Sequence, residues 1–531
     1  MRWLGPILAL ICLMTGAPRA SWADQASDTL VVAISGEIRN LDHQYTTDRD
    51  TIVLAELTDD GLFYVDPETL GYVPLVAQSY AQADDRTIDV TIRSGVRFHD
   101  GSPLGADDVV YTYNYVLDAD TKTNRGRSIQ SWLASIEKTG PMSVRFHLKH
   151  PYPLAIRDMG SDVQLRKAGT YRLADGKNDL NAAALHLNGT GPYRVASFEP
   201  GVRVVLERFE GYYADSAKGR PAIRNIVFRS IPDLGAQQAE VISGGVQWMY
   251  NVPTDVAVNV AATGYARHVE GPSLRVGFIP LDAAGLTGKD NPFTKRDVRR
   301  AVIHAIDREA IVKYLIGGKS EVIHAACHPV QFGCEQDVQK YPYDPDEARR
   351  LLAKAGYPQG FEFDLWAYRE RQVAEAVTAA LVKVGIRARL RYVKLSTLDQ
   401  ARKKRHIPAY FGSWESGSTA DTATIAEIHW SPKSDRNFAL DEQVSSDMAG
   451  AIQTIDPAKR ATLYSRALRR IAEEAYWVPL AAFSQNYLIA NDLDYPVSRD
   501  GLPRLFRARW AMAGKTAEAS SARPAMQQEG R

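Results

Sequence analysis

The stretch Gly95-Val-Arg-Phe-His-Asp-Gly-Ser-Pro-Leu-Gly-Ala-Asp-Asp-Val-Val-Tyr-Thr-Tyr-Asn-Tyr-Val116 carries the clearest local structural signals in the chain. The preceding run from Thr87 to Arg93 alternates apolar and polar residues as a half-buried strand does, and Asp100-Gly101 is typical of a tight turn. Gly105 stands at a helix cap position, and two aspartates follow it in a first helical turn. Apolar residues then recur at helical spacing. The stretch predicts a strand, a turn and an amphipathic helix.

Composition and the N-terminal residues indicate a secreted globular protein. The 531 residues are enough for two or three domains, with 45% hydrophobic and 24% charged residues. Arg2, the apolar run from Leu4 to Met14 and the small residues of Ser21-Trp-Ala23 predict a secretory signal, residues 1–23, cleaved after Ala23. Cleavage removes two arginines and no acid, so the formal net charge changes from +1 to −1. Such a balance gives no electrostatic signature of nucleic-acid binding.

Two cysteines, Cys327 and Cys334, remain after the predicted cleavage. A close pair in an oxidising compartment predicts a disulfide bond. The alternative is a metal site, because His324-Ala-Ala-Cys327-His328 crowds three potential ligands together. That run lacks the paired spacing of a zinc site, so the sequence favours the disulfide.

Three later blocks carry equally definite signals: residues 188–201, 291–312 and 344–358. In the first block, Gly189-Thr-Gly191 has no third glycine and precedes a predicted strand, so it indicates a turn and not a phosphate site. In the second block, Thr294 is predicted to cap an amphipathic helix. The third block predicts a capped helix followed by a strand.

These four blocks resemble, in the same order, sequence patterns of the solute-binding proteins of ABC importers known as family 5. The opening stretch is similar to the family pattern "GVKFHDG-x-P-L/V-T-A-E-D-V", and residues 188–201 to "G-T-G-P-Y/F". The resemblance extends over residues 28 to 512. It departs at Gln247, where the family usually has aspartate.

The resemblance implies an α/β fold: a two-lobed periplasmic binding protein of type II, cluster C, with an inserted subdomain and two hinge crossings. Such lobes close around a ligand that contacts both of them. The crossings are expected near residues 274–278 and 478–483. We expect lobe I at 24–57, 188–274 and 482–513, the inserted subdomain at 58–187, lobe II at 275–481 and a disordered tail at 514–531.

The segment from Tyr410 to Asp421 is similar to the family's ligand loop. Peptide binders have "G-W-x-x-D" there, and the aspartate neutralises the α-ammonium of the peptide. Trp414 matches the tryptophan, although a core role is the alternative, and Gly417 stands where the aspartate is expected. Glu415 or Asp421 could substitute for it, and Ser413 also belongs to this candidate site.

Two residues outside the loop complete the candidate ligand site. Arg369 lies near the position at which dipeptide binders have a carboxylate-binding arginine, and Arg371 is a rival for that role. A guanidinium group can bind a carboxylate through two hydrogen bonds. Tyr111 lies where some oligopeptide binders contact ligand, with a core position as the alternative.

The resemblance implies the periplasmic substrate-binding component of an ABC importer, which captures a peptide or peptide-like solute and delivers it to permease subunits in the inner membrane. We expect a monomer without cofactor. The alternative cargo is a non-peptide solute: an opine or amino-acid conjugate, a nickel chelate, haem or an oligosaccharide. His406 and His429 are the candidate residues for a metal chelate. A secreted hydrolase is a remote alternative, because Gly-x-Ser-x-Gly and His-Glu-x-x-His are both missing from the sequence.

Overall fold

The computed structural model describes residues 27–46, 48–172, 177, 179 and 182–511. The predicted signal segment and the predicted tail lie outside the described residues. Within these ranges, none of the helices has both the length and the apolar character needed to cross a membrane.

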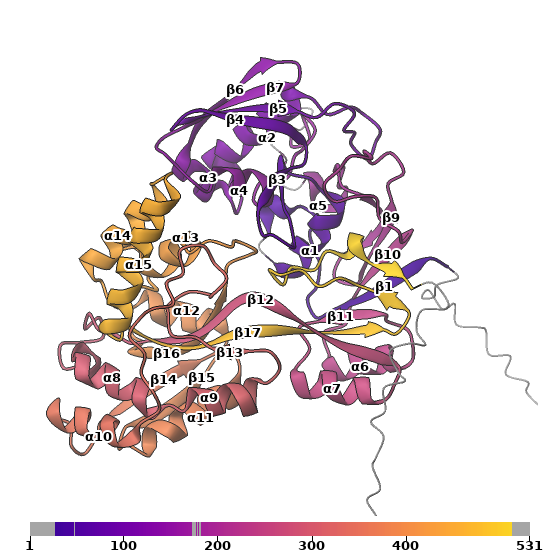
Figure 1. Cartoon of the computed structure of the whole chain (residues 1–531). Coiled ribbons are helices and arrows are strands. Elements are labelled where there is room, and N and C mark those ends of the chain that lie inside the picture. The colour runs from indigo at the N-terminus through magenta and orange to yellow at the C-terminus, as the bar shows by residue number, and fades with distance from the viewer. Residues whose placement is uncertain (1–26, 47, 173–176, 178, 180–181, 512–531) are drawn as a thin grey trace, which may run out of the picture.

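One large mixed sheet runs through the molecule (Figure 1). Its strands lie in the order β15-β14-β16-β12-β17-β11-β1-β10-β9-β8, and β13 pairs with β17 beside this path. The strands are β1 (Thr29–Ile34), β8 (Tyr193–Glu199), β9 (Arg203–Arg208), β10 (Asn225–Ser230), β11 (Trp248–Tyr250), β12 (Ala266–Pro280), β13 (Glu321–Val322), β14 (Glu362–Ala367), β15 (Arg387–Tyr392), β16 (Ala409–Glu415) and β17 (Trp477–Ala490).

The long strands β12 and β17 join the two halves of this sheet. They pair in antiparallel fashion from Ala266 opposite Ala490 to Pro280 opposite Trp477, with an irregularity between Pro272 and Val276. On one side they continue into β11 and β1, and on the other into β16 and β14. Both predicted crossings, 274–278 and 478–483, lie within these two strands. The limits of the lobes themselves stay a prediction.

Helices flank both halves of the sheet. In Figure 1, α6 and α7 lie below β11, α9 to α11 lie below the half formed by β14 to β16, α8 lies beside that half, and α14 and α15 pack together at its edge. These helices are α6 (Leu234–Ile242), α7 (Thr254–Ala262), α8 (Arg296–Ala305), α9 (Arg308–Ile311), α10 (Pro345–Lys354), α11 (Arg371–Val382), α12 (Leu395–Lys403), α13 (Ala423–Ile425), α14 (Glu442–Ile452) and α15 (Pro457–Glu473).

A separate four-stranded antiparallel sheet, β4-β5-β7-β6, caps the first half of the molecule (Figure 1). It comprises β4 (Ala77–Asp84), β5 (Thr87–Ile92), β6 (Leu133–Gly140) and β7 (Ser143–Leu148). The accompanying helices and short strands are α2 (Ala106–Leu117), α3 (Gly126–Trp132), α4 (Ala155–Ser161), α5 (Ala182–Leu185), β2 (Phe63–Val65) and β3 (Tyr72–Pro74).

The local prediction for the opening stretch is confirmed. In β5, Ile88, Val90 and Ile92 are buried and alternate with more exposed residues. Gly105 caps α2 with an extended backbone, and its N–H donates to the carboxylate of Asp108 over 2.9 Å. The apolar face of α2 then packs on the sheet through the edge of the Tyr113 ring.

The predicted cap at Thr294 is wrong. Asn291 instead caps a short 3-10 helix, Pro292–Thr294, by accepting a hydrogen bond from the backbone N–H of Phe293 over 3.0 Å. The helix α8 begins only after Lys295, and the side chain of Lys295 makes no capping hydrogen bond. The proline two residues before Thr294 fixes the first turn and therefore moves the helix start.

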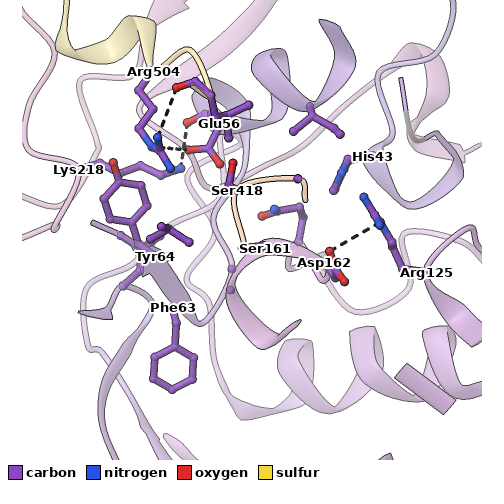
Figure 2. Close-up of a pocket in the computed structure, with 18 of the residues that line it drawn as sticks. His43, Glu56, Phe63, Tyr64, Arg125, Ser161, Asp162, Lys218, Ser418 and Arg504 are labelled. Atoms are coloured by element: carbon purple, nitrogen blue, oxygen red, sulfur yellow. Dashed lines mark hydrogen bonds and ion pairs between the residues drawn. The ribbon is translucent and has the colours of Figure 1, made fainter. Parts of the chain in front are cut away.

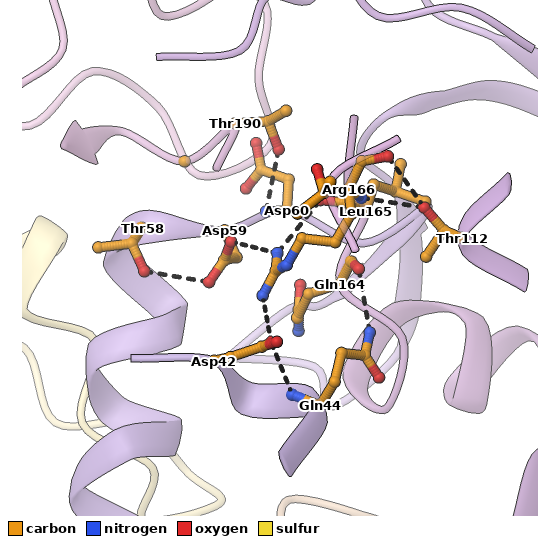
Figure 3. Close-up of polar contacts among 12 residues, drawn as sticks. Asp42, Gln44, Thr58, Asp59, Asp60, Thr112, Gln164, Leu165, Arg166 and Thr190 are labelled. Atoms are coloured by element: carbon orange, nitrogen blue, oxygen red, sulfur yellow. Dashed lines mark hydrogen bonds and ion pairs between the residues drawn. The ribbon is translucent and has the colours of Figure 1, made fainter. Parts of the chain in front are cut away.

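A fully buried cluster of charges joins the small sheet's region to the segment before α1 (Arg49–Thr58) (Figure 3). The guanidinium group of Arg166 donates to Asp59 over 2.6 Å and to Asp42 over 3.0 Å. The hydroxyl of Tyr171 also donates to Asp42, over 2.6 Å. Because a buried charge is stable only when it is paired, these contacts hold the segment around residue 43 at a fixed place beside α1.

Candidate ligand-binding cleft

A small cavity of about 50 Å³, partly open to solvent, lies between the two halves of the molecule. Helix α1 provides Arg49 and Glu56, and strand β2 provides Phe63 and Tyr64. From the opposite side, Gly417 and Ser418 of the loop after β16 line the same space. Figure 2 shows Ser418 between the side chains of Tyr64 and Arg504 at one end and those of His43 and Arg125 at the other.

One ion pair crosses the cleft directly. Nη1 of Arg49 lies 2.6 Å from Oε1 of Glu415, the last residue of β16. Nη2 of Arg49 donates to the carbonyl of Gly501 over 2.7 Å. The Glu415 carboxylate raises the pKa of Arg49, although burial opposes this. The ion pair between Arg49 and Glu415 therefore links the two halves of the molecule.

Arginines cluster around this ion pair. Arg275 of β12 lies opposite Glu415 in the sheet, and its Nε donates to Oγ of Ser413 over 2.9 Å. Nη1 of Arg369 donates to the same oxygen over 2.8 Å. Arg275 also pairs with Glu370. Three guanidinium groups, of Arg49, Arg275 and Arg369, thus face two carboxylates.

This arrangement leaves positive charge in excess. Burial and the neighbouring guanidinium of Arg369 lower the pKa of Arg275 to about 9. A cation whose pKa falls in this way lacks full compensation, so an additional carboxylate would be favoured here. The side chain of Arg369 is 42% exposed and can therefore be reached from solvent.

The loop after β16 has an unusual backbone. Gly417 and Ser418 both adopt positive φ, +58° and +70°. A Cβ atom added at Gly417 would meet no heavy atom within 4 Å. The position where peptide binders of the family have aspartate is thus open to the cleft.

The disulfide bond Cys327–Cys334 is present, as predicted, and it closes a segment that braces this loop. Nε2 of Gln331 donates to the carbonyl of Thr419 over 3.0 Å, and the N–H of Phe332 donates to the carbonyl of Ala420 over 2.9 Å. The disulfide segment and the cleft-lining loop are therefore hydrogen-bonded to each other.

The other predicted site residues lie elsewhere. Asp421 is buried, and its carboxylate accepts from Arg460 over 2.7 Å, while Tyr464 donates to it over 3.3 Å. The half-buried ring of Trp414 packs on the edge of His429, with the ring centres 5.7 Å apart. Of the site residues predicted from the sequence, Gly417 lines the cavity, whereas Ser413, Glu415, Arg369, Trp414 and Asp421 do not.

Tyr111 also lies outside the cavity lining, where its hydroxyl accepts from the N–H of Tyr171 over 2.8 Å. Arg371, the rival of Arg369, pairs with Glu375 on the exposed face of α11. His406 is exposed, and His429 is enclosed by aromatic rings. Among the residues described, no group of three His, Cys, Asp or Glu side chains is arranged to hold a metal ion.

Sequence reasoning missed most of the cavity wall. Its polar members come from segments far apart in the chain, and each belongs to an unremarkable local pattern. Two are paired internally: Lys218 lies 2.8 Å from Asp60, and Arg504 lies 2.8 Å from Asp500. The remaining polar wall residues are His43, Arg49, Glu56, Arg125, Ser161, Asp162, Gln164 and Ser418.

Two α/β halves joined by a pair of long strands, with a polar cavity between them, define a two-lobed solute-binding protein. The comparisons with known proteins agree. The family model described as "Bacterial extracellular solute-binding proteins, family 5 Middle" matches residues 71–437. The chain therefore belongs to this family, whose members serve ABC importers, and the predicted fold class is confirmed.

Individual relatives are similar over most of the chain. The glutathione-binding protein GsiB of Salmonella paratyphi A is 27% identical over 477 residues, which cover 87% of this chain and 90% of GsiB. The oligopeptide-binding protein AppA of Bacillus subtilis, solved with a nonapeptide, is 25% identical with a TM-score of 0.73, covering 91% of this chain and 99% of AppA. A dipeptide-binding protein of Pseudoalteromonas sp. SM9913, solved with Met-Leu, is 21% identical with a TM-score of 0.77, covering 91% and 100%.

Proposed function

We propose that this protein binds a short peptide or peptide conjugate that carries at least one carboxylate, and delivers it to the permease of an ABC importer. The observation that carries this proposal is the group of three guanidinium groups facing two carboxylates where the halves of the sheet meet. A carboxylate of the cargo would complete the charge balance through charge-assisted hydrogen bonds. Arg369 and Arg275, both bonded to Ser413, are the proposed contacts.

No free carboxylate among the predicted site residues is available to pair with an ammonium group of the cargo. Gly417 supplies no carboxylate, Asp421 is bound by Arg460, and Glu415 is paired with Arg49. An ammonium group buried without a partner is strongly unfavourable. This favours a solute whose net charge is negative. Glutathione, with two carboxylates and one ammonium group, satisfies that condition, and GsiB is named for binding it.

Five of the residues predicted from the sequence have proposed roles, and these roles are supported to different degrees. Gly417 lines the cavity and Glu415 is paired with Arg49, which also lines it, and both are proposed to contact the cargo. Trp414 and Tyr111 would need to turn toward the cleft when ligand binds. Asp421 is proposed to act by holding the loop in place through Arg460.

The setting of the protein is part of the proposal. The signal-like residues 1–23, the internal disulfide and the family's extracellular character support secretion to the periplasm after cleavage behind Ala23. We propose that the mature chain acts as a monomer, meets the permease subunits at the inner membrane and performs no catalysis.

A binding screen with the purified chain beginning at Asp24 tests the proposal. Thermal unfolding and calorimetry would be measured with glutathione, Met-Leu, a nonapeptide, an opine and a nickel chelate. A solute at 100 times its dissociation constant stabilises a protein by about 2.7 kcal/mol. We expect glutathione or another anionic peptide to shift unfolding, and the same peptide with an amidated C-terminus to bind more weakly. Turnover of an ester or peptide without any binding shift would refute the proposal.

A further inference from the structure

One end of the cleft is lined by polar side chains that do not belong to the arginine cluster. His43 is the first residue of the short helix η1 (His43–Tyr45), and Arg125 directly precedes α3. Asp162 and Gln164 belong to the segment that follows α4. Figure 2 shows the ring of His43 close to Arg125 and Asp162, at the end of the cavity opposite Tyr64 and Arg504. His43 is 1% exposed and Gln164 is 6% exposed.

Several polar atoms here lack a hydrogen-bond partner in the part of the chain that the structure describes. Both ring nitrogens of His43 and Oε1 of Gln164 have no hydrogen bond, and Nε of Arg125 has only an ion-pair contact with Asp162 at 3.7 Å, beyond hydrogen-bond distance. Leaving a buried donor or acceptor unpaired is unfavourable, because the group loses its hydrogen bonds to water without gaining others. Three side chains from separate segments thus line one end of the cavity, and each carries a buried polar atom that is not satisfied within the described residues.

The guanidinium groups at this end are already matched by carboxylates of the protein. Asp162 accepts from Arg157 over 2.7 Å and lies 3.7 Å from Arg125, and Asp158 accepts from Arg157 over 2.8 Å. The cations of Arg125 and Arg157 therefore face the carboxylates of Asp158 and Asp162, and the carboxylate of Glu427 also acts on Arg157 and Asp162. His43 adds no charge, because burial and the positive charge of Arg125 lower its pKa to about 4. An anionic group of the cargo would find no free cation here.

We propose that the pocket formed by His43, Arg125 and Gln164 is a subsite for a neutral amide of the cargo. This inference rests on the proposed function and names a chemical group that the same cleft selects. The carbonyl of an amide would accept from Nε of Arg125, and its N–H would donate to Oε1 of Gln164. Neutral His43 offers one donor and one acceptor nitrogen, so it pairs with either side of the amide.

Other chemical groups fit less well. A carboxylate has no proton to give to Gln164 Oε1 and would lie beside Asp162. An ammonium group cannot accept from Arg125 and would be repelled by it. An apolar group would leave all of the unpaired atoms unsatisfied. Only a group that is both donor and acceptor satisfies the three side chains together.

Crystals soaked with acetamide, and separately with acetate, test the subsite without any assumption about the cargo. We expect acetamide between His43, Arg125 and Gln164, and we expect acetate there only weakly or not at all. Water alone after the acetamide soak, or acetate in preference to acetamide, would overturn the inference. Acetamide that stays at full occupancy in crystals of the Gln164→Leu variant would overturn it as well.

Affinity for glutathione gives the second measurement. His43→Phe and Gln164→Leu should each weaken binding at least tenfold, whereas His147→Phe, on the exposed face of β7, should leave it unchanged. If glutathione binds the wild type and His43→Phe equally, the subsite is wrong and the proposed function stands. If acetamide occupies the subsite but no peptide-like solute binds the protein, the proposed function fails and the subsite stands.

Discussion

Arg49 and Glu415 face each other across the cleft, with Nη1 of the arginine 2.6 Å from Oε1 of the glutamate. Arg49 is the first residue of α1, and Glu415 is the last residue of β16. Both side chains are about three-quarters buried, at 24% and 22% exposure. Glu415 therefore occupies, from within the protein, a position at which a carboxylate of the cargo would also be attracted.

Replacing this internal carboxylate should make the cleft more receptive to anions. In Glu415→Gln, Arg49 loses its charged partner, so we expect an anionic peptide to bind about fivefold more tightly, the equivalent of roughly 1 kcal/mol for such a pair. The unliganded protein should also open, because the direct ion pair between the halves is lost. Calorimetry measures the first effect and the radius of gyration from X-ray scattering the second.

Glu375→Gln is the matched control, since Glu375 pairs with Arg371 on the outer face of α11. It should change neither quantity. Weaker binding of all peptides by Glu415→Gln would mean that Glu415 holds the cargo's ammonium group and replaces the missing aspartate.

Arg369 and Arg371 provide a second comparison within one short segment. Arg369 donates to Ser413 beside the cleft, whereas Arg371 lies on α11 with Glu375. We expect Arg369→Met to weaken binding of a peptide with a free carboxylate about 30-fold, because a charge-assisted hydrogen bond contributes about 2 kcal/mol. Arg371→Met should have little effect on the binding of this peptide. Neither variant should weaken the binding of a peptide whose C-terminus is amidated. If both variants lose the same peptide affinity, Arg369 is not a specific contact of the cargo's carboxylate.

The disulfide should influence ligand binding through the loop that it braces. Gln331 and Phe332, both inside the disulfide segment, hydrogen-bond the carbonyls of Thr419 and Ala420. Reduction, or the double change Cys327→Ser and Cys334→Ser, should lower the free energy of unfolding by about 2 kcal/mol, since the closed loop is short. We also expect a several-fold loss of peptide affinity. Reductant should have no further effect on the double variant, and unchanged affinity in that variant would show that the loop holds its shape alone.

The sequence predicted the local elements well because their signals are local. The alternation of β5 and the cap of α2 depend on residues that are neighbours in the chain, and both are found where expected. The start of α8 was misplaced because Pro292 and Asn291 together favour a separate 3-10 turn before it. Such competition between two possible caps depends on small energy differences.

The cleft was predicted far less well, for a physical reason. Asp421 was a candidate for an ammonium partner, yet Arg460, 39 residues later, takes its carboxylate. His43 and Arg125 approach each other only because the buried ion pairs of Arg166 fix the segment before α1. No pattern in the sequence reports which charges meet across such distances. Arg369 and Ser413 were named because the family resemblance supplied the missing spatial information.

Restoring a carboxylate at position 417 should change the preferred cargo. The space beyond Gly417 is open, and aspartate tolerates positive φ better than most residues do. We expect Gly417→Asp to bind peptides with a free α-ammonium at least tenfold more tightly than the wild type, with a loss of about 1 kcal/mol in folding stability. Gly417→Asn has the same shape without the charge and should show the stability loss alone. If Gly417→Asp and Gly417→Asn bind the peptides with the same affinity, the cargo's ammonium group does not lie near position 417.

His429 should make the protein sensitive to acid. Its ring is fully buried between Phe278, Trp414 and Trp477, and neither nitrogen has a hydrogen-bond partner among the described residues. Burial, together with the positive charges of Arg436 and Arg402, lowers the pKa of His429 well below its usual value. Between the unfolded pKa, about 6.5, and this lower value, the unfolded chain takes up a proton that the folded chain refuses. This histidine therefore reduces stability as the pH falls below about 6.5, by up to about 1.4 kcal/mol per pH unit.

The variant His429→Phe removes this proton uptake and keeps an aromatic ring in the same place. Urea unfolding at pH 7.5 and pH 5.0 should show a smaller loss of stability in the variant than in the wild type, by roughly 2 kcal/mol over the 1.5 units below pH 6.5. His147→Phe, on the surface of β7, controls for the removal of a histidine as such. If His429→Phe and the wild type lose equal stability between the two pH values, then water or a rearranged side chain reaches the ring and allows it to be protonated in the folded protein.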